Sequence, residues 1–277
     1  MAFSQSATDT PFAVKIQRRP LVMAHRGGAG LWPENTMHSF ERAVDLGVDV
    51  LETEIQGTAD NILVLMHDST VDRTTNGSGP ISSFTLEELK TLDAGYNWSA
   101  DGGQTFPFRG SGITVPTLEE LCTALPTVRI NIDIKQEKPS LVASLCKTIR
   151  TFDMVDKVMV ASFSSKVLKA FRRSCPEVTT SAGTGEVALF FLMNLVFLGG
   201  FYRSGFQAFQ IPEHSSGLRV LTKRFVKTAH DLNLAVHVWT INETMDMQRL
   251  LELGVDGIIT DYPDRLISLL REPGDDS

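Results

Sequence analysis

The feature that most constrains the fold is the alternation of short, β-branched apolar runs with longer amphipathic stretches. Eight apolar runs are predicted to be strands: Leu21–Ala24, Val48–Ile55, Arg129–Ile134, Val158–Ala161, Val178–Ala182, Ala208–Ile211, Ala235–Thr240 and Gly257–Thr260. Apolar residues three and four positions apart predict helices between them: Thr36–Leu46, Ser140–Thr151, Ser165–Arg173, Thr222–Leu232 and Thr244–Leu253. Eight strand–helix units within about 250 residues are typical of a (β/α)8 TIM barrel. A doubly wound open sheet is the alternative, but no glycine-rich dinucleotide motif follows the first strand.

The regular spacing breaks once, after the second predicted strand. About sixty residues rich in Gly, Ser, Thr, Asp and Asn precede the next helical pattern at Thr117–Ala124. They contain a short strand-like run, Asn61–Met66, and a helix signal in which Thr85 and Glu88 form a capping box. Because loops at the carboxyl ends of barrel strands carry function, this insertion is expected to build one wall of the site.

Net charge and cysteine content narrow the class of function. The 277 residues include 33 acidic and 26 basic side chains, so the net charge is −7 and there is no general electrostatic reason to bind nucleic acid. Cys122, Cys146 and Cys175 form no CxxC pair and are expected to be free thiols of a reducing compartment. The first twenty residues lack the apolar core of a signal peptide, so a cytoplasmic location is expected.

One long apolar run, Val187–Leu198, is interrupted only by Asn194. Its 12 residues are too few to span a bilayer, which requires about 20. Two interpretations remain open for residues 187–198. They form a buried or half-buried helix, or they form an apolar lip that contacts a membrane surface or a lipid-like substrate.

Polar side chains gather where the first two predicted strands end. His25 and Arg26 follow the first strand and would stand at the mouth of a barrel. Glu52 and Glu54 are two positions apart on the second strand, so both point to the same side. Two adjacent carboxylates would raise each other's pKa unless a cation lies between them. A divalent metal site with oxygen ligands is therefore favoured over a pair at a solvated rim.

The third strand supplies a matching polar face. Asn131, Asp133 and Lys135 share one side of it. Asp133 can complete a three-carboxylate site with Glu52 and Glu54, and Lys135 is suited to a phosphate oxygen. The alternative for Lys135 is an isolated internal salt bridge with a carboxylate.

Histidine and tryptophan residues complete the candidate site. His67 returns a second imidazole to the region of His25, and two imidazoles can act as an acid–base pair near neutral pH. Trp239, at the end of the seventh strand, is a candidate apolar wall for substrate, with plain packing as the alternative. His237 is expected to be a barrel-core residue, and His214 is a weaker candidate for the site.

Taken together, these motifs resemble the glycerophosphodiester phosphodiesterase family from Leu21 to about Leu270. The matching pieces are His25-Arg26-Gly27, Pro33-Glu34-Asn35-Thr36, Gly47-Val48-Asp49-Val50-Leu51-Glu52, His67-Asp68, Asp72-Arg73-Thr74-Thr75, Asn131-Ile132-Asp133-Ile134-Lys135, Val238-Trp239-Thr240-Ile241-Asn242 and Asp256-Gly257-Ile258-Ile259-Thr260-Asp261-Tyr262-Pro263. The resemblance implies one barrel domain over residues 1–277, with a small insertion subdomain at about 68–116.

The resemblance also implies roles for individual residues. His25 and His67 would be the acid–base pair, while Arg26 and Lys135 would hold the phosphate. Glu34 would orient the loop after the first strand or contact the glycerol hydroxyls. One Mg²⁺ or Ca²⁺ ion, with Mn²⁺ as a further candidate, would be bound by three carboxylates: Glu52, Glu54 and Asp133.

Two ligands depart from the family pattern. Glu54 stands where the family usually has Asp, and Asp133 stands where it usually has Glu. One ligand is thus a methylene longer and the other a methylene shorter, which would shift the metal toward the third strand.

The resemblance implies hydrolysis of a glycerophosphodiester to glycerol 3-phosphate and an alcohol. It also implies the substrate's own 2-hydroxyl as nucleophile, giving a cyclic phosphate that water then opens. A lysophospholipase D acting on acyl-bearing lysophospholipids is one alternative, favoured by residues 187–198. A non-catalytic lipid-binding barrel and a barrel enzyme that removes a proton beside a carbonyl are two others. The alcohol released, the metal and the oligomeric state stay open.

Overall fold

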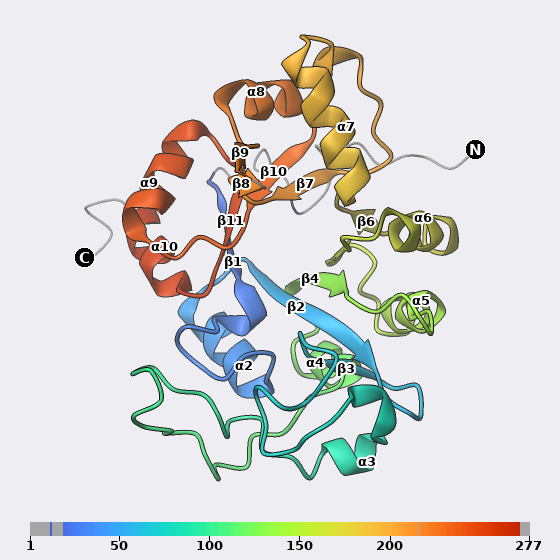
Figure 1. Ribbon diagram of the computed structural model, residues 1–277, viewed down its shortest axis with the longest axis vertical. Coiled ribbons are helices and arrows are strands. Elements are labelled where there is room, and N and C mark those ends of the chain that lie inside the picture. The colour runs from blue at the N-terminus through green and yellow to red at the C-terminus, as the bar shows by residue number, and fades with distance from the viewer. Residues whose placement is uncertain (1–11, 13–18, 216, 272–277) are drawn as a thin grey trace.

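The computed structural model describes residue 12, residues 19–215 and residues 217–271. Its centre is a ring of parallel strands whose neighbours follow the order β6-β5-β4-β2-β1-β11-β10-β7. A parallel bridge between Ser181 and Ala208 joins the two ends of this order. The predicted (β/α)8 barrel is therefore confirmed (Figure 1). The strands are β1 (Leu21–Ala24), β2 (Val50–Gly57), β4 (Arg129–Ile134), β5 (Val158–Ala161), β6 (Thr179–Thr180), β7 (Ala208–Ile211), β10 (Ala235–Val238) and β11 (Gly257–Thr260).

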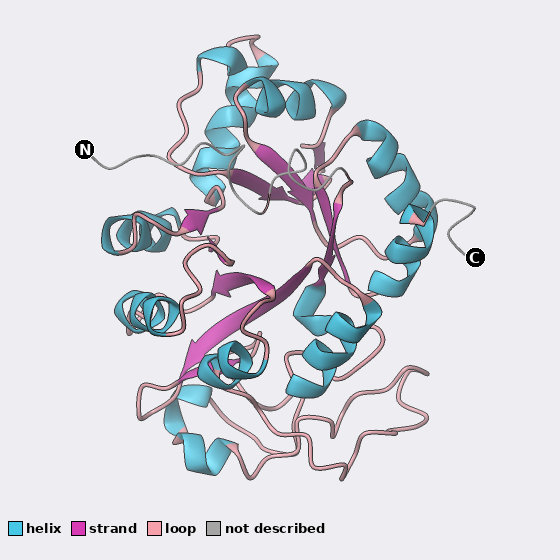
Figure 2. Ribbon diagram, turned by 180° about the vertical axis from the view of Figure 1, so that it is seen from behind, coloured by secondary structure: helices cyan, strands magenta, loops and turns pink. Residues whose placement is uncertain are grey.

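Helices surround the ring, as Figure 2 shows from behind. Several begin where a hydroxyl side chain accepts a backbone N–H bond, as Thr36, Ser164 and Thr222 do. Such local signals explain why the predicted helix bounds lie close to the observed ones. The surrounding helices are α2 (Met37–Leu46), α4 (Leu118–Ala124), α5 (Val142–Thr151), α6 (Ser165–Ser174), α7 (Thr184–Leu195), α8 (Lys223–Asp231), α9 (Thr244–Leu253) and α10 (Pro263–Leu270).

Alternate strand residues pack on opposite sides of the ring. In β1, Leu21 and Met23 point into the barrel core, whereas Val22 packs outward against the helices. His237 of β10 is fully buried in the barrel, and its Nε2 lies 3.1 Å from the carbonyl oxygen of Phe12. His237 is thus a barrel-core histidine, as predicted.

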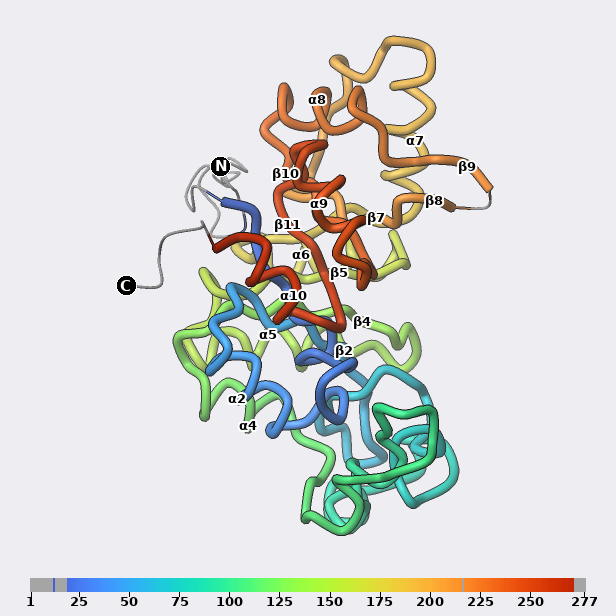
Figure 3. Tube along the Cα trace, turned by 90° about the vertical axis from the view of Figure 1, so that its left-hand side faces the viewer, coloured from blue at the N-terminus to red at the C-terminus, as the bar shows by residue number. Residues whose placement is uncertain are grey.

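The long insertion lies at the end of the molecule opposite α7 and α8 (Figures 1 and 3). It follows β3 (Leu63–Leu65), which pairs antiparallel with the end of β2, and it contains η3 (Ile81–Ser83) and α3 (Leu86–Leu89). Thr85 and Glu88 form the predicted capping box of α3. A separate small apolar cluster packs the insertion against β3 and the residue after it: Val64, Met66, Val71, Ile81, Leu89, Ala94 and Val115.

The expectation that all three cysteines are free thiols is wrong for two of them. Cys146 of α5 and Cys175, which follows α6, form a disulfide, so only Cys122 is a free and buried thiol. The packing of α5 on α6 places the Cα atoms of this pair 6.0 Å apart, and sequence spacing cannot show that proximity.

Within the described residues, no helix is long and apolar enough to cross a membrane. Most of the amino-terminal segment that was considered for a signal peptide lies outside the described residues.

Candidate active site

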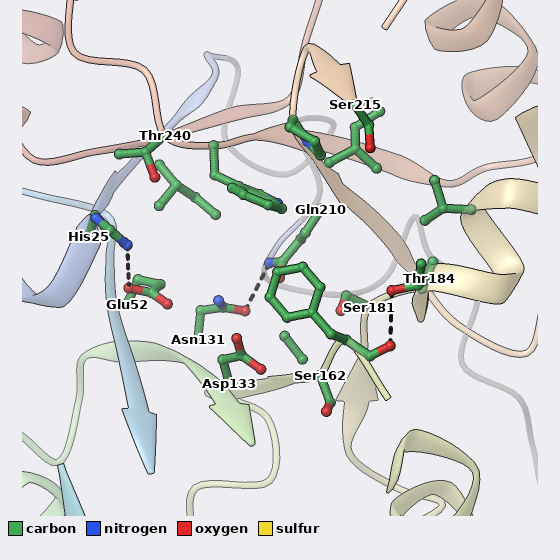
Figure 4. A pocket seen from close by; sticks show the side chains of 18 of the residues that line it. His25, Glu52, Asn131, Asp133, Ser162, Ser181, Thr184, Gln210, Ser215 and Thr240 are labelled. Atoms are coloured by element: carbon green, nitrogen blue, oxygen red, sulfur yellow. Dashed lines mark hydrogen bonds and ion pairs between the residues drawn. The ribbon is translucent and has the colours of Figure 1, made fainter. Parts of the chain in front are cut away.

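A cavity of about 700 Å³ opens at the carboxyl ends of the barrel strands. Strand-end residues on one side and α7 on the other enclose it, as Figure 4 shows for His25, Glu52 and Thr184. Glu34 does not line this cavity, but its Oε1 accepts a hydrogen bond from Nη1 of Arg26, which does. The predicted residues that do line it are His25, Arg26, Glu52, Glu54, His67, Asp133, Lys135 and Trp239.

A sharp turn after β1 presents the first site residues. His25, Arg26 and Gly27 form the short helix η2, in which Gly27 has a φ of 81°. A Cβ atom at this position would lie 2.5 Å from Oγ of Ser39 on α2, so glycine is required for this close approach.

Arg26 is tied to the acidic residues around it. It has a left-handed φ of 52°, and its backbone N–H donates to Oε2 of Glu52 at 3.0 Å. Its Nε donates to Oε1 of Glu54 at 3.1 Å, and its Nη1 donates to Oε1 of Glu34 at 3.0 Å. Asn35 donates to the other oxygen of Glu54 at 2.9 Å. The two oxygens of Glu54 are therefore held in place from the side of β1.

The register between β2 and β4 brings the predicted carboxylates to one face. Glu52 is opposite Asn131, and Glu54 is opposite Asp133. One ligand atom each from His25, Glu52 and Glu54 lies within 4.8 Å of the others, a spacing at which they could hold an ion. Asp133 lines the same cavity from β4 and is not part of that closest group.

The electrostatics around these carboxylates favour a cation. Burial, and then the charge of Glu54, raise the pKa of Glu52 to about 8. Burial also raises the pKa of Asp133, although the charge of Lys135 opposes the change. Oδ2 of Asp133 pairs with Nζ of Lys135 at 2.8 Å, while its buried Oδ1 has no hydrogen-bond partner among the described residues. An oxygen-rich site with an unsatisfied acceptor fits a hard divalent cation.

His25 is paired with a carboxylate that the sequence analysis did not single out. Its Nδ1 lies 2.6 Å from Oδ1 of Asp261, which follows β11, and its Nε2 lies 4.0 Å from Oε2 of Glu52. Asn242 fixes Asp261 by donating to its Oδ2 at 2.7 Å. Burial alone would lower the pKa of His25, but the bond with Asp261 and the charge of Glu52 outweigh burial and raise it. Polar residues directly after the last two strands were the signal for this pair.

His67 has the same arrangement on the insertion side. Its Nδ1 lies 2.6 Å from Oδ1 of Asp68, whose Oδ2 accepts from Nε of Arg73 at 2.6 Å. Arg73 also donates to both oxygens of Glu34, each at 2.7 Å. Because Glu34 also contacts Arg26, a continuous series of charged contacts joins the insertion to the turn after β1.

The opposite side of the cavity is apolar. Trp239 lines it and packs edge-on against Phe163, with ring centroids 5.6 Å apart. On α7, Val187, Ala188 and Phe191 complete this wall. His214, the weaker candidate, lies exposed on the strand β8 (His214–Ser215) and is not among the lining residues. The cavity thus joins a charged half to an apolar half.

The cavity at the carboxyl ends of the barrel strands thus brings together two imidazoles and three carboxylates. Residues 25–265 match the model of the glycerophosphoryl diester phosphodiesterase family. The chain therefore belongs to that family and is a phosphoric diester hydrolase.

Individual relatives agree with this assignment. The chain is 35% identical to a glycerophosphodiester phosphodiesterase of Caldanaerobacter subterraneus, with 92% of this chain and 100% of the relative aligned. A rat lysophospholipase D is 26% identical over 90% of this chain and 85% of its own length. A solved Oleispira antarctica phosphodiesterase in complex with the product sn-glycerol-3-phosphate superimposes with a TM-score of 0.75, at 25% identity and with 91% and 97% of the two chains covered.

Proposed function

We propose that the chain hydrolyses glycerophosphodiesters to glycerol 3-phosphate and an alcohol, with a bound divalent cation and two catalytic histidines. The observation that carries the proposal is the matched pair of imidazoles on one cavity. His25 and His67 each direct Nδ1 to a carboxylate. An Nδ1–H held in this way leaves Nε2 free to exchange protons with a substrate.

Proton transfer by these two histidines balances the reaction. One imidazole removes the proton from the attacking oxygen. If that oxygen belongs to water, glycerol 3-phosphate forms directly; if it is the substrate's own 2-hydroxyl, a cyclic phosphate forms, and water then opens it to glycerol 3-phosphate. The other donates a proton to the alcohol oxygen as its bond to phosphorus breaks. Lys135 and Arg26 lie at the same cavity and supply positive charge for the phosphoryl oxygens.

Glu52, Glu54 and Asp133 are proposed to hold the cation, with Mg²⁺, Ca²⁺ and Mn²⁺ as candidates. A bound cation supplies charge neutralisation and lowers the pKa of a coordinated hydroxyl. The raised pKa of Glu52 and the unpartnered oxygen of Asp133 support this assignment. Arg26 and Lys135 pair with Glu54 and Asp133, so part of the charge of these two acids is balanced when no ion is bound.

The test is a panel of phosphodiesters assayed with the chelator-treated chain after addition of each cation. We expect no turnover with chelator, recovery with at least one divalent cation, and glycerol 3-phosphate as the product. Binding of phosphodiesters without turnover in every cation would contradict the proposal and would instead favour a non-catalytic lipid-binding barrel.

A second candidate, a lysophospholipase D, is favoured by the apolar half of the cavity. Trp239, Phe163 and Phe191 would contact an acyl chain without leaving polar groups unpaired. Glycerophosphocholine and lysophosphatidylcholine compared in one assay separate the two. A higher kcat/KM for the lysophospholipid would assign the chain to the second activity.

A further inference from the structure

From Val187 onward, helix α7 has apolar residues on every side with Asn194 as the exception, yet the rest of the chain covers only part of it. Phe190 packs inward and is fully buried, while Phe191 lines the cavity. On the remaining side, Leu189, Leu192 and Leu195 are 53%, 58% and 56% exposed. A helix that is apolar all round is normally enclosed by protein or lipid, so the uncovered side of α7 requires an explanation.

The exposed apolar surface continues past the end of α7 into η4 (Gly199–Phe201). Phe197 and Phe201 are 81% and 73% exposed, the largest fractions among the aromatic residues of this region. Contiguous apolar surface of this kind marks a binding surface rather than chance exposure. We call it the apolar patch and define it by six residues: Leu189, Leu192, Leu195, Val196, Phe197 and Phe201.

Basic side chains border the apolar patch. The guanidinium of Arg224, on α8, lies 3.6 Å from the centre of the Phe197 ring, and Arg203 follows Phe201 closely in the chain. Within the part of the chain that the structure describes, no carboxylate is in ion-pair distance of Arg203, Lys223 or Arg224. Of the five basic side chains in residues 187–227, Arg219 and Lys227 pair with Glu213 and Asp231, and the other three have no carboxylate at ion-pair distance among the described residues. Positive charge is therefore concentrated beside exposed apolar side chains.

The apolar patch is continuous with the mouth of the cavity. One side of α7 lines the cavity, and the patch occupies the adjoining side of the same helix. Leu218, on the short strand β9 (Leu218–Arg219), lines the cavity and is itself 60% exposed. The β8–β9 hairpin extends from the barrel next to α7 (Figure 3). A surface bound to the patch would therefore lie beside the entrance to the cavity.

We propose that the apolar patch binds the surface of an anionic lipid bilayer. Phe197 and Phe201 enter the headgroup region, and the bordering arginine and lysine residues face the lipid phosphates. A second copy of this chain is a poorer occupant, because a two-fold contact would bring the two sets of basic side chains together. This inference does not depend on which phosphodiester the site hydrolyses.

The test is co-sedimentation of the full chain with phosphatidylcholine vesicles, with and without phosphatidylglycerol. We expect binding to the anionic vesicles that weakens as salt is added. The double variant Phe197→Ser/Phe201→Ser should lower the partition coefficient by about 100-fold or more, because both aromatic rings would no longer be buried in the headgroup region. Met245→Ser is the matched control, since Met245 is 86% exposed but lies on α9, and it should leave binding unchanged.

A second variant tests the charge. Arg203→Glu/Lys223→Glu should also lower binding to anionic vesicles by about tenfold or more, because it replaces two positive charges near the anionic surface with two negative ones. Circular dichroism and the turnover of a short soluble phosphodiester without vesicles should match the wild-type chain for all variants. If the wild-type chain does not turn over the phosphodiester, the proposed activity is wrong, but vesicle binding still tests the apolar patch independently.

Three results would overturn the inference. The first is equal binding of the chain to neutral and anionic vesicles. The second is unchanged vesicle binding by both double variants. The third is conversion of a dimer to a monomer by Phe197→Ser/Phe201→Ser with no change in sedimentation with vesicles. The last result would assign the apolar patch to a contact between copies of this chain.

Discussion

The two histidine–carboxylate pairs of the cavity use the same contact but are built differently. His25 follows β1 and is paired with Asp261, 236 positions further along the chain, after β11. His67 is paired with its own neighbour, Asp68, at the start of the insertion. The first pair is more enclosed, with side-chain exposures of 16% and 22%, against 32% and 30% for the second. Closure of the barrel positions one imidazole, and local sequence positions the other.

This difference determines what else each pair depends on. Asp261 is held by Asn242, so the His25 pair rests entirely on the ends of adjacent barrel strands. Asp68 accepts a hydrogen bond from Arg73, which also donates to Glu34. The position of the His67 pair therefore depends on contacts between the insertion and the loop after β1. The barrel half is expected to tolerate less change than the insertion half.

The largest expected effect is loss of either imidazole. His25→Ala and His67→Ala should each lower kcat by ~10²–10⁴, because each removes one of two required proton transfers. The measurement is steady-state hydrolysis of glycerophosphocholine with saturating cation. His214→Ala, outside the cavity, serves as the control and should match the wild-type chain. Near-normal turnover by either of the first two variants would end the assignment of an acid–base pair.

A smaller effect separates the two carboxylates. Asp261→Asn should lower kcat by about 10- to 100-fold, and Asp68→Asn should lower it less, because the more exposed His67 can regain a water contact. We expect Asp261→Asn to move the His25-dependent limb of the pH–rate profile to lower pH, because the bond with Asp261 raises the pKa of that imidazole. A larger loss in Asp68→Asn than in Asp261→Asn would reverse the comparison.

The smallest effect concerns stability without a cation. In the folded chain the pKa of Glu52 is about 8, against an ordinary value of 4.5, so between these values the folded state holds a proton that the unfolded state lacks. The free energy of unfolding should therefore fall as the pH rises through this range, by up to about 1.4 kcal/mol per pH unit. Urea unfolding of the chelated chain measures the slope. Glu52→Gln or saturating cation should reduce the slope, and Asp68→Asn should leave it unchanged.

Local patterns predicted most of the barrel, because the periodicity that distinguishes strands from helices depends only on residues close together in the sequence. β4, β5, β7 and β11 have the predicted bounds, and the two-residue spacing of Glu52 and Glu54 placed both on the cavity side. Asp261, Asn242 and the Cys146–Cys175 disulfide were missed, because each acquires its partner only when distant segments meet.

Residues 187–198 show a second limit of prediction from sequence, which concerns burial. Its length excluded a membrane span, and α7 occupies Thr184–Leu195, close to the expected segment. Periodicity could not decide how much of the helix is covered, because residues apolar on every side give no preferred face. The structure shows a half-buried helix, with Phe190 inside and Leu192 outside.

The ring of strands is not equally secured around its circumference. β2 and β4 are in register over six residue pairs, whereas β6 and β7 meet through the single bridge between Ser181 and Ala208. The β6–β7 junction, where α7 follows β6, thus has the shortest run of paired residues in the ring. The sparsest pairing of the ring therefore lies beside the apolar wall, whereas Glu52, Glu54 and Asp133 stand on its longest strand ladder.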